Sequence, residues 1–541
     1  MVFKMFYGRK SGHKKYKVTR ARTTIAAVCA LGTVAAACGT STAQPNASAA
    51  KSSSANAAVG DTLTYANSSG PLSLDPAIMG NGRVGAYAQP AYDSLITIQP
   101  NGSLTPDLAT SWQFAPGSQN KTFVINLRHG VKFSDGEAMT ATAVVNSIKY
   151  FQKKSFFASN LGQVSSIVAS GPNQVTISLS APNPELPYAL DQYWQLGDII
   201  SPAGLSNPTQ LGTATFGAGP YVLDPSQTIS QNTYTYTPNP YYWNKAAVRW
   251  KKIVIKVFAN TNSALQALEG GQVQAMVGSV PLAQTLAGNT AVKVLSSKVQ
   301  WSGVIITDRQ GKIVPALAHV RVRQALNYAI GRSAINNALY GKFGAPTDQI
   351  QGPGFIGYSA SFANQYKYNL AKAKSLLAQA GYPHGFSMTL LEQGTTQTNL
   401  MAEAVVGQLA KIGVQATIKN DTTFTQFLQD GLSEKYPAFV GELNMSSPYL
   451  TYLEDFQGSH NLWNPFGVVN AQRLSEISQA VAEPASQASG LWKTIWVQTM
   501  QRADWIPISE SPVLYFISSS VNAVAPGQEL SLNPLAITPA G

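Results

Sequence analysis

The chain has 541 residues, more than one hydrophobic core usually serves, so we expect at least two lobes. Charged residues make up only 12% of the chain and aromatic residues 10%, which is typical of a folded protein with a weakly charged surface. The formal net charge of +12 does not indicate nucleic-acid binding, because eight of the positive charges lie before Thr23, where there is no acidic residue, and removing them leaves +4.

The basic N-terminal segment and the apolar stretch after it have the pattern of a signal peptide. Residues 23–37 (TTIAAVCALGTVAAA) are too few to span a bilayer comfortably. The three alanines before Cys38 resemble a bacterial lipobox, although such motifs usually have Leu where Ala35 stands. We therefore predict a lipoprotein signal peptide over residues 1–37, with Cys38 carrying the lipid. Cleavage at an Ala-x-Ala site, which would release a soluble protein, and a retained membrane helix are the alternatives.

The two cysteines of the chain both belong to this region. Cys29 lies inside the apolar stretch and would be removed with it, so the mature chain would have no disulfide, cysteine nucleophile or cysteine metal site. Residues 38–58 are mostly Ser, Ala, Thr, Asn and Gln, which predicts a flexible tether.

A glycine-rich loop follows the first predicted strand, which covers residues 61–67. Residues 80–85 read GNGRVG, formally GxGxxG, but no βαβ unit surrounds them and no acidic residue stands at the distance that a ribose needs. We reject dinucleotide binding and predict a flexible loop, on which Arg83 is either a ligand contact or a solvated side chain.

Residues 106–151 contain a strand, a turn and a helix in close succession. Residues 121–127 alternate, with Phe123, Ile125 and Leu127 on one face, which predicts a half-buried strand. Ser-Asp-Gly at 134–136 indicates a turn, and Thr140 can then cap a helix with one apolar stripe.

The same stretch resembles the family 5 extracytoplasmic solute-binding proteins, the peptide-type receptors of ABC importers. Their signature of Pro-x-Leu-Ala-x-Ser-Trp, a strand, and Leu-Arg-x-Gly-Val-x-Phe-x-Asp-Gly is matched by residues 106–112 and 127–136. The resemblance implies an α/β fold like that of type II (cluster C) periplasmic binding proteins. This fold has two lobes, an extra subdomain in lobe 1 and a ligand cleft between the lobes.

The second half of the chain shows further matches to this family. Residues 320–332 resemble its Val-Arg-x-Ala-Leu…Ala-Ile-Asp-Arg helix, and we expect Arg321 and Arg323 to form structural ion pairs rather than a nucleic-acid patch. Asn369 can cap a helix that ends before Gly381. The strand–helix–strand pattern over residues 387–418 predicts a parallel sheet in lobe 2.

Ligand specificity in this family depends on the segment that corresponds to residues 437–448. Peptide-binding members have an Asp there that holds the α-amino group of the peptide, and Asn444 stands at that position here. An Asn gives up a charge-assisted hydrogen bond worth roughly 1.5–3 kcal/mol. Either the ligand has no free ammonium at this point, or Glu442 replaces the missing carboxylate, or the alignment is shifted.

The candidate ligand-binding residues are therefore drawn from several segments. They comprise the glycine-rich loop, the predicted crossing strand that starts near residue 301, the specificity segment and a Gly/Asn/Pro-rich loop. These residues are Asn81, Arg83, Trp301, Glu442, Asn444, Met445 and Trp463.

The domain boundaries follow from the same matches. We predict residues 59–100 and 215–300 as lobe 1, 101–214 as its extra subdomain and 301–500 as lobe 2. Residues 501–541 return to lobe 1 and form the C-terminal tail.

No motif of an enzyme, of a nucleotide-binding loop or of a metal site was found in the chain. We therefore expect no cofactor, no metal and no enzymatic activity. The predicted function is that of a lipid-anchored receptor on the outer face of the bacterial cell membrane, which binds a peptide or peptide-like solute. Its partners would be a membrane permease and ATPase subunits, and nucleic acid is not among them. The alternatives are a secreted or anchored hydrolase that uses cleft carboxylates, and a lipoprotein that binds a sugar or metal chelate or takes part in signalling.

Overall fold

The computed structural model describes residues 62–80, 82–422, 424–445, 447–455, 462–527 and 529–540. The predicted signal peptide, Cys38, the tether and Asn81 lie outside these residues, as does the side chain of Arg83. No helix of the described residues is long and apolar enough to cross a membrane.

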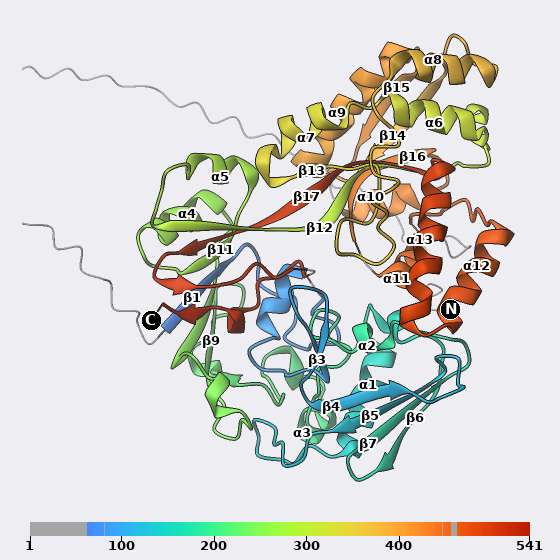
Figure 1. Ribbon diagram of the computed structural model, residues 1–541. Coiled ribbons are helices and arrows are strands. Elements are labelled where there is room, and N and C mark those ends of the chain that lie inside the picture. Colours follow the sequence, from blue (N-terminus) through green and yellow to red (C-terminus); the bar gives the residue numbers. More distant parts are fainter. Residues whose placement is uncertain are drawn as a thin grey trace, which may run out of the picture. The chain divides into compact units, whose positions relative to one another are not determined.

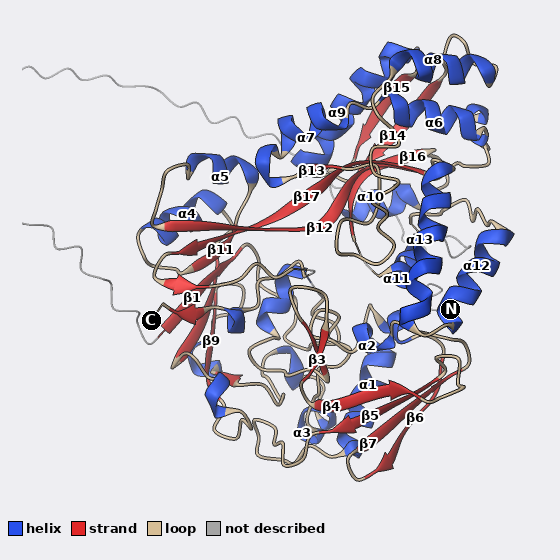
Figure 2. Ribbon diagram, in the orientation of Figure 1, coloured by secondary structure: helices blue, strands red, loops and turns tan. Residues whose placement is uncertain are grey.

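One 11-stranded mixed sheet extends through both lobes (Figures 1 and 2). Two long antiparallel strands, β12 (Val292–Ile306) and β17 (Trp505–Ser518), form its middle. On one side of this pair follow β16 (Ala438–Asn444), β14 (Ser387–Glu392) and β15 (Gln415–Asn420) of lobe 2. The other side belongs to lobe 1 and contains, in order, β11 (Ala275–Val277), β1 (Thr62–Asn67), β10 (Lys252–Val257), β9 (Thr233–Pro238) and β8 (Tyr221–Leu223). The eleventh strand, the short β13 (Ala345–Pro346), lies outside this order and pairs with β17.

Strands β12 and β17 connect the two lobes. The second half of β12, from Gln300 onward, pairs with β16, while the end of β17 at residues 515–517 pairs with β11. The ladder between β12 and β17 has register shifts after Ser297 and after Ser302, where the strands pass from one lobe to the other. Strand β12 begins nine residues before the predicted start, because residues 292–297 pair with β17.

The extra subdomain is a separate antiparallel sheet with a helix. Its strands are β4 (Ala109–Phe114), β5 (Thr122–Leu127), β7 (Gln174–Leu179) and β6 (Val164–Gly171), in that order. The predicted half-buried strand is confirmed as β5, in which Phe123, Ile125 and Leu127 are buried. The helix α1 (Ala141–Lys154) begins directly after Thr140, whose hydroxyl accepts a hydrogen bond from the backbone of Ala143 at 3.2 Å.

Short elements connect the extra subdomain to the rest of lobe 1. The strands β2 (Ile96–Ile98) and β3 (Leu104–Pro106) form a hairpin before it. The helices α2 (Leu186–Ala189) and α3 (Pro202–Ser206) follow β7, and β18 (Val521–Asn522) pairs with β19 (Thr538–Pro539) in the tail. Lobe 1 also contains α4 (Thr261–Glu269) and α5 (Val280–Thr285).

Lobe 2 contains the predicted parallel unit, since β14 and β15 are parallel neighbours joined by α9 (Thr396–Leu409). The Asn369 side chain caps α8 (Leu370–Gln379) as expected, by accepting from the backbone of Lys372 at 2.9 Å. The remaining helices are α6 (Val320–Ala329), α7 (Arg332–Leu339), α10 (Phe424–Gly431), α11 (Pro448–Asp455), α12 (Ala471–Ala482) and α13 (Ala485–Gln501).

A buried ion-pair network holds α6 to the start of β17. Arg323 lies 3.2 Å from one carboxylate oxygen of Asp504, and Arg473 of α12 lies 2.8 Å from the other. Burial opposes ionisation of Asp504, but Arg473, Arg309 and Arg323 together lower its pKa below the usual value. The expected structural ion pairing is therefore confirmed for Arg323, whereas Arg321 is exposed.

Candidate functional site

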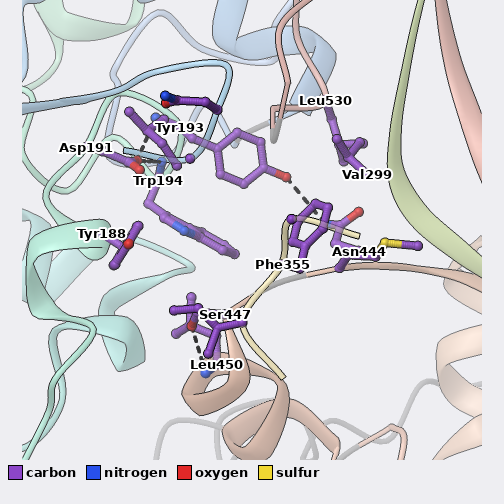
Figure 3. A pocket seen from close by; sticks show the side chains of 16 residues that line it. Tyr188, Asp191, Tyr193, Trp194, Val299, Phe355, Asn444, Ser447, Leu450 and Leu530 are labelled. Carbon is purple, nitrogen blue, oxygen red and sulfur yellow. Dashed lines mark hydrogen bonds between the residues drawn. The ribbon is translucent and has the colours of Figure 1, made fainter. Parts of the chain in front are cut away.

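A cavity of about 120 Å³ lies where residues of lobe 1 and lobe 2 meet (Figure 3). Lobe 1 contributes the β2–β3 hairpin, the segment after α2 and the C-terminal tail. Lobe 2 contributes the end of β16, the start of α11 and the loop at 354–356, and β12 passes along the cavity. The lining residues are Ile98, Asn101, Gly102, Tyr188, Asp191, Tyr193, Trp194, Val299, Gly354, Phe355, Ile356, Asn444, Met445, Ser447, Leu450 and Leu530.

Two adjacent aromatic residues, Tyr193 and Trp194, form one wall of the cavity. The Asp191 carboxylate accepts hydrogen bonds from the backbone N–H of Tyr193 at 2.9 Å and of Trp194 at 3.1 Å, which closes a tight turn. The two rings are 5.1 Å apart and nearly perpendicular, and Trp194 also packs edge-on against Phe157 at 5.2 Å. The turn and the ring contacts together fix both aromatic side chains before any ligand binds.

Asn444, the last residue of β16, faces Tyr193 across the cavity. Its amide nitrogen donates to the Tyr193 hydroxyl at 3.3 Å (Figure 3). Its amide oxygen accepts from the Gln300 side chain at 3.2 Å. Gln300 is the partner of Asn444 in the β12–β16 ladder, so strand pairing sets the position of the amide. Because Tyr193 belongs to lobe 1 and Asn444 to lobe 2, their hydrogen bond joins the two lobes at the cavity.

The electrostatic character of the cavity is close to neutral. Its lining contains no Lys, Arg or Glu among the described residues, and its one acid, Asp191, is 1% exposed. Burial raises the pKa of the Asp191 carboxyl to about 7, against the hydrogen bonds from Trp194 and Tyr193. A charged ligand would find no fixed opposite charge among these side chains.

A second buried acid, Glu185, stands next to the cavity without lining it. Glu185 is 5% exposed, and the Ser447 hydroxyl donates a hydrogen bond to its carboxyl group. Its Oε2 atom has no hydrogen-bond partner among the described residues. Burial raises the pKa of Glu185 to about 7, so near neutral pH it is close to half protonated.

The structure brings two of the predicted ligand-binding residues, Asn444 and Met445, to this cavity. Glu442 lies two residues earlier on β16 and accepts a hydrogen bond from the Tyr340 hydroxyl at 2.8 Å, outside the lining. Of the alternatives for this segment, the geometry therefore places the neutral Asn444, and not Glu442, where the lobes meet.

Two predicted tryptophans lie elsewhere. Trp301 is 1% exposed and packs against Trp505, with the ring centres 5.7 Å apart. Trp463 packs against Phe427 and Phe439 at 6.1 and 6.3 Å. Both therefore contribute to packing within lobe 2, and neither lines the cavity.

The candidate list from the sequence omitted the aromatic side chains of the cavity. The aromatic pair at 193–194 was visible as a pattern, but nothing in the sequence showed that it faces β16 rather than solvent. Phe355 and Val299 carried no signal, because each belongs to a segment whose position depends on contacts with distant parts of the chain.

The comparisons with known proteins agree with this architecture. Residues 103–461 match the model of the bacterial extracellular solute-binding proteins, family 5. The chain is 27% identical over 459 residues to the glutathione-binding protein of Shigella dysenteriae, and the matched region covers 80% of this chain and 86% of that protein. It is 25% identical over 515 residues to heme-binding protein A of Haemophilus influenzae, covering 85% and 88%.

Among solved structures, HbpA2 from Haemophilus parasuis superposes with a TM-score of 0.77. That match has 20% sequence identity and covers 89% of this chain and all of the other. At this identity the likeness establishes the fold, which is that of a two-lobed periplasmic binding protein as the sequence predicts.

Proposed function

Because the chain belongs to the bacterial extracellular solute-binding proteins of family 5, we propose that it is the solute receptor of an ABC importer. In this proposal it captures a peptide or peptide-like solute between its lobes and delivers it to a membrane permease, which cytoplasmic ATPases energise. The observation that carries the proposal is the cavity to which both lobes contribute, with the Tyr193–Asn444 hydrogen bond across it.

The two-lobed architecture supports capture by lobe closure. Strands β12 and β17 join the lobes, and their register shifts lie where the chain passes between them. A ligand that contacts Tyr193 and Asn444 at once makes contacts that exist only when the lobes are together, so its binding free energy favours the closed state. The permease would then recognise the closed receptor.

The proposal includes a lipid anchor on Cys38. Its support is the basic segment, the short apolar stretch and the alanines that precede Cys38. Expression in a bacterial host with radiolabelled palmitate tests this point. We expect label in the wild-type protein and its loss, with release from the membrane fraction, in Cys38→Ser. Equal labelling of both proteins would contradict the anchor.

The transport role is tested on the purified mature chain. Native mass spectrometry identifies any solute that remains bound through purification or is captured from a growth-medium extract. Small-angle scattering then measures whether that solute reduces the radius of gyration. We expect a bound solute and compaction. Capture of no solute from peptide, sugar or metal-chelate pools would contradict the receptor role, and chemical turnover of the solute would favour a hydrolase.

A further inference from the structure

The walls of the interlobe cavity indicate the chemical class of the solute. On the premise of the proposed function, we infer that the solute is uncharged and carries a flat ring, which lies against Tyr193 and Trp194 while a polar group of the solute bonds to Asn444. This ligand class differs from a free peptide, which carries an ammonium and a carboxylate.

The first argument is the missing counter-charge. Moving an ion into a buried site costs several kcal/mol unless an opposite charge or a set of hydrogen bonds replaces its water. The lining described by the structure has no basic side chain, and the Asp191 Oδ1 atom is already bonded to two backbone N–H groups. Glu185 does not line the cavity, and because its pKa is about 7 it is close to half protonated near neutral pH and supplies no full counter-charge. An uncharged solute avoids this cost.

The second argument is the arrangement of aromatic side chains. Tyr193 and Trp194 come from lobe 1 and Phe355 from lobe 2, and Figure 3 shows the Tyr193 ring directed toward Phe355 and Asn444. Aromatic pairs add about 0.5–1.5 kcal/mol beyond the area that they bury. A flat ring between these walls contacts both lobes, which is the requirement for a ligand that drives closure.

The third argument is the hydrogen-bonding capacity of Asn444. Its amide has two N–H groups and an oxygen with two lone pairs, of which Tyr193 and Gln300 take one each. In the described part of the chain this leaves one donor and one acceptor for the solute. An amide or a hydroxyl group satisfies both, whereas a carboxylate only accepts and an ammonium only donates.

The cavity volume limits the size of the solute. At about 120 Å³ it is well below the 300–1,000 Å³ that is common for small-molecule sites. With the lobes in contact as they are here, it accepts one ring system with a short polar substituent rather than an extended chain.

The experiment compares four solutes that share one ring and differ in charge. They are N-acetylphenylalaninamide (neutral), phenylalaninamide (cation), N-acetylphenylalanine (anion) and phenylalanine (zwitterion). Isothermal titration of the mature chain measures their affinities, and the growth-medium capture described above supplies the natural solute. We expect the neutral compound to bind at least about tenfold more tightly than the others, and the captured solute to be uncharged and cyclic.

The outcomes separate this inference from the transport role. A charged member that binds as well as the neutral one overturns the inference, as does a captured solute that is charged or lacks a ring, and in each of these cases the receptor role stands. If none of the four binds, the captured solute alone decides. Capture of nothing contradicts the receptor role, and the inference fails with it.

Three variants locate the effect at the cavity. Asn444→Asp keeps an acceptor for Gln300 and allows the Tyr193 hydroxyl to donate, so we expect it to fold and to shift preference toward phenylalaninamide. The matched control is Glu442→Gln on the same strand, which should leave the order of affinities unchanged. Glu185→Gln should leave the affinities for the neutral compound and for phenylalaninamide within about threefold of wild type, and a tenfold loss confined to phenylalaninamide would show that Glu185 binds a cation. An unchanged ligand preference in Asn444→Asp, as judged on folded protein by circular dichroism, would place the solute elsewhere.

Discussion

At the scale of single residues, Asp191 shapes the cavity through the backbone rather than by facing the solute. Its carboxylate holds the turn that presents Tyr193 and Trp194, at the cost of burying an acid. The residue thus positions two aromatic rings of the cavity wall, through hydrogen bonds that need an oxygen acceptor rather than a negative charge.

Two replacements of Asp191 separate its charge from its capacity to accept hydrogen bonds. Asp191→Asn keeps an oxygen acceptor for both backbone N–H groups, so we expect ligand affinity close to that of the wild type. Asp191→Ala leaves two buried donors without a partner, which costs roughly 1–3 kcal/mol each in the folded state, and affinity should fall at least tenfold. Titration calorimetry measures the affinity of both variants for the captured solute. Equal affinities for the two variants would show that the turn does not depend on this carboxyl.

The arginines of α6 offer a second comparison between residues that look alike in the sequence. Arg323 is 1% exposed and paired with Asp504, whereas Arg321 is exposed. We expect Arg323→Ala to lower the free energy of unfolding by about 3–5 kcal/mol, because breaking a buried pair leaves a poorly compensated charge. Arg321→Ala should change it by less than about 0.5 kcal/mol. Urea denaturation measures both, and similar losses would contradict a structural role specific to Arg323.

At the scale of elements, a contact outside the cavity also joins the lobes. Asn120, in the turn between β4 and β5, donates from its side-chain amide to the carbonyl oxygens of Val481 at 2.9 Å and Glu483 at 3.0 Å. These carbonyls lie at the end of α12, where backbone acceptors lack helical partners. The extra subdomain therefore caps a helix of lobe 2.

Removing this cap tests whether it helps to hold the lobes together. Asn120 has a φ of 58°, so Asn120→Gly keeps the backbone conformation and removes only the side-chain amide. We expect a larger radius of gyration for the ligand-free protein and weaker ligand binding, with the cavity residues intact. Gln119→Gly is the control, since Gln119 is an exposed neighbour with a φ of 53°. Identical scattering curves for the two variants would show that the cap does not influence closure.

At the scale of the whole molecule, lobe 1 has an unusual group of buried acids. Burial raises the pKa of Asp93, Glu185 and Asp191 to about 7, and it raises those of Asp198 and Glu529 well above their usual values. Between pH 4.5 and 7 the folded state therefore holds protons that the unfolded chain has released. The free energy of unfolding consequently falls as the pH rises through this range.

We expect a higher melting temperature near pH 5.5 than near pH 8, with the loss complete once these carboxyls ionise. Below about pH 4 stability should fall again, because protonation of Asp504 weakens its pairing with Arg323 and Arg473. Scanning calorimetry from pH 3.5 to 8.5 measures the melting temperature over both ranges. In the double variant Glu185→Gln with Asp191→Asn, the fall in melting temperature between pH 5.5 and 8 should be smaller. A melting temperature that rises from pH 5.5 to 8 would contradict this account.

The sequence by itself determined those features that depend on local patterns. The strand at 122–127, the Thr140 and Asn369 caps and the parallel unit of lobe 2 follow from periodicity and capping chemistry, and the structure confirms them. The family match predicted the two-lobed fold, because an ordered series of short motifs is specific even when each motif is weak. The signal peptide and the lipid on Cys38 remain predictions outside the described residues.

Only the tertiary structure decided which side chains meet between the lobes. Glu442 and Asn444 share one face of β16, and pairing with β12 places only Asn444 at the cavity. Tryptophan is a residue type that often contacts ligands, which made Trp301 and Trp463 candidates. In the structure Trp301 packs against Trp505, and Trp463 packs against Phe427 and Phe439, away from the cavity. Tyr193 and Phe355, more than 150 residues apart in the sequence, line the same cavity because the two lobes meet there. Such contacts depend on long-range geometry, which no local pattern in the chain encodes.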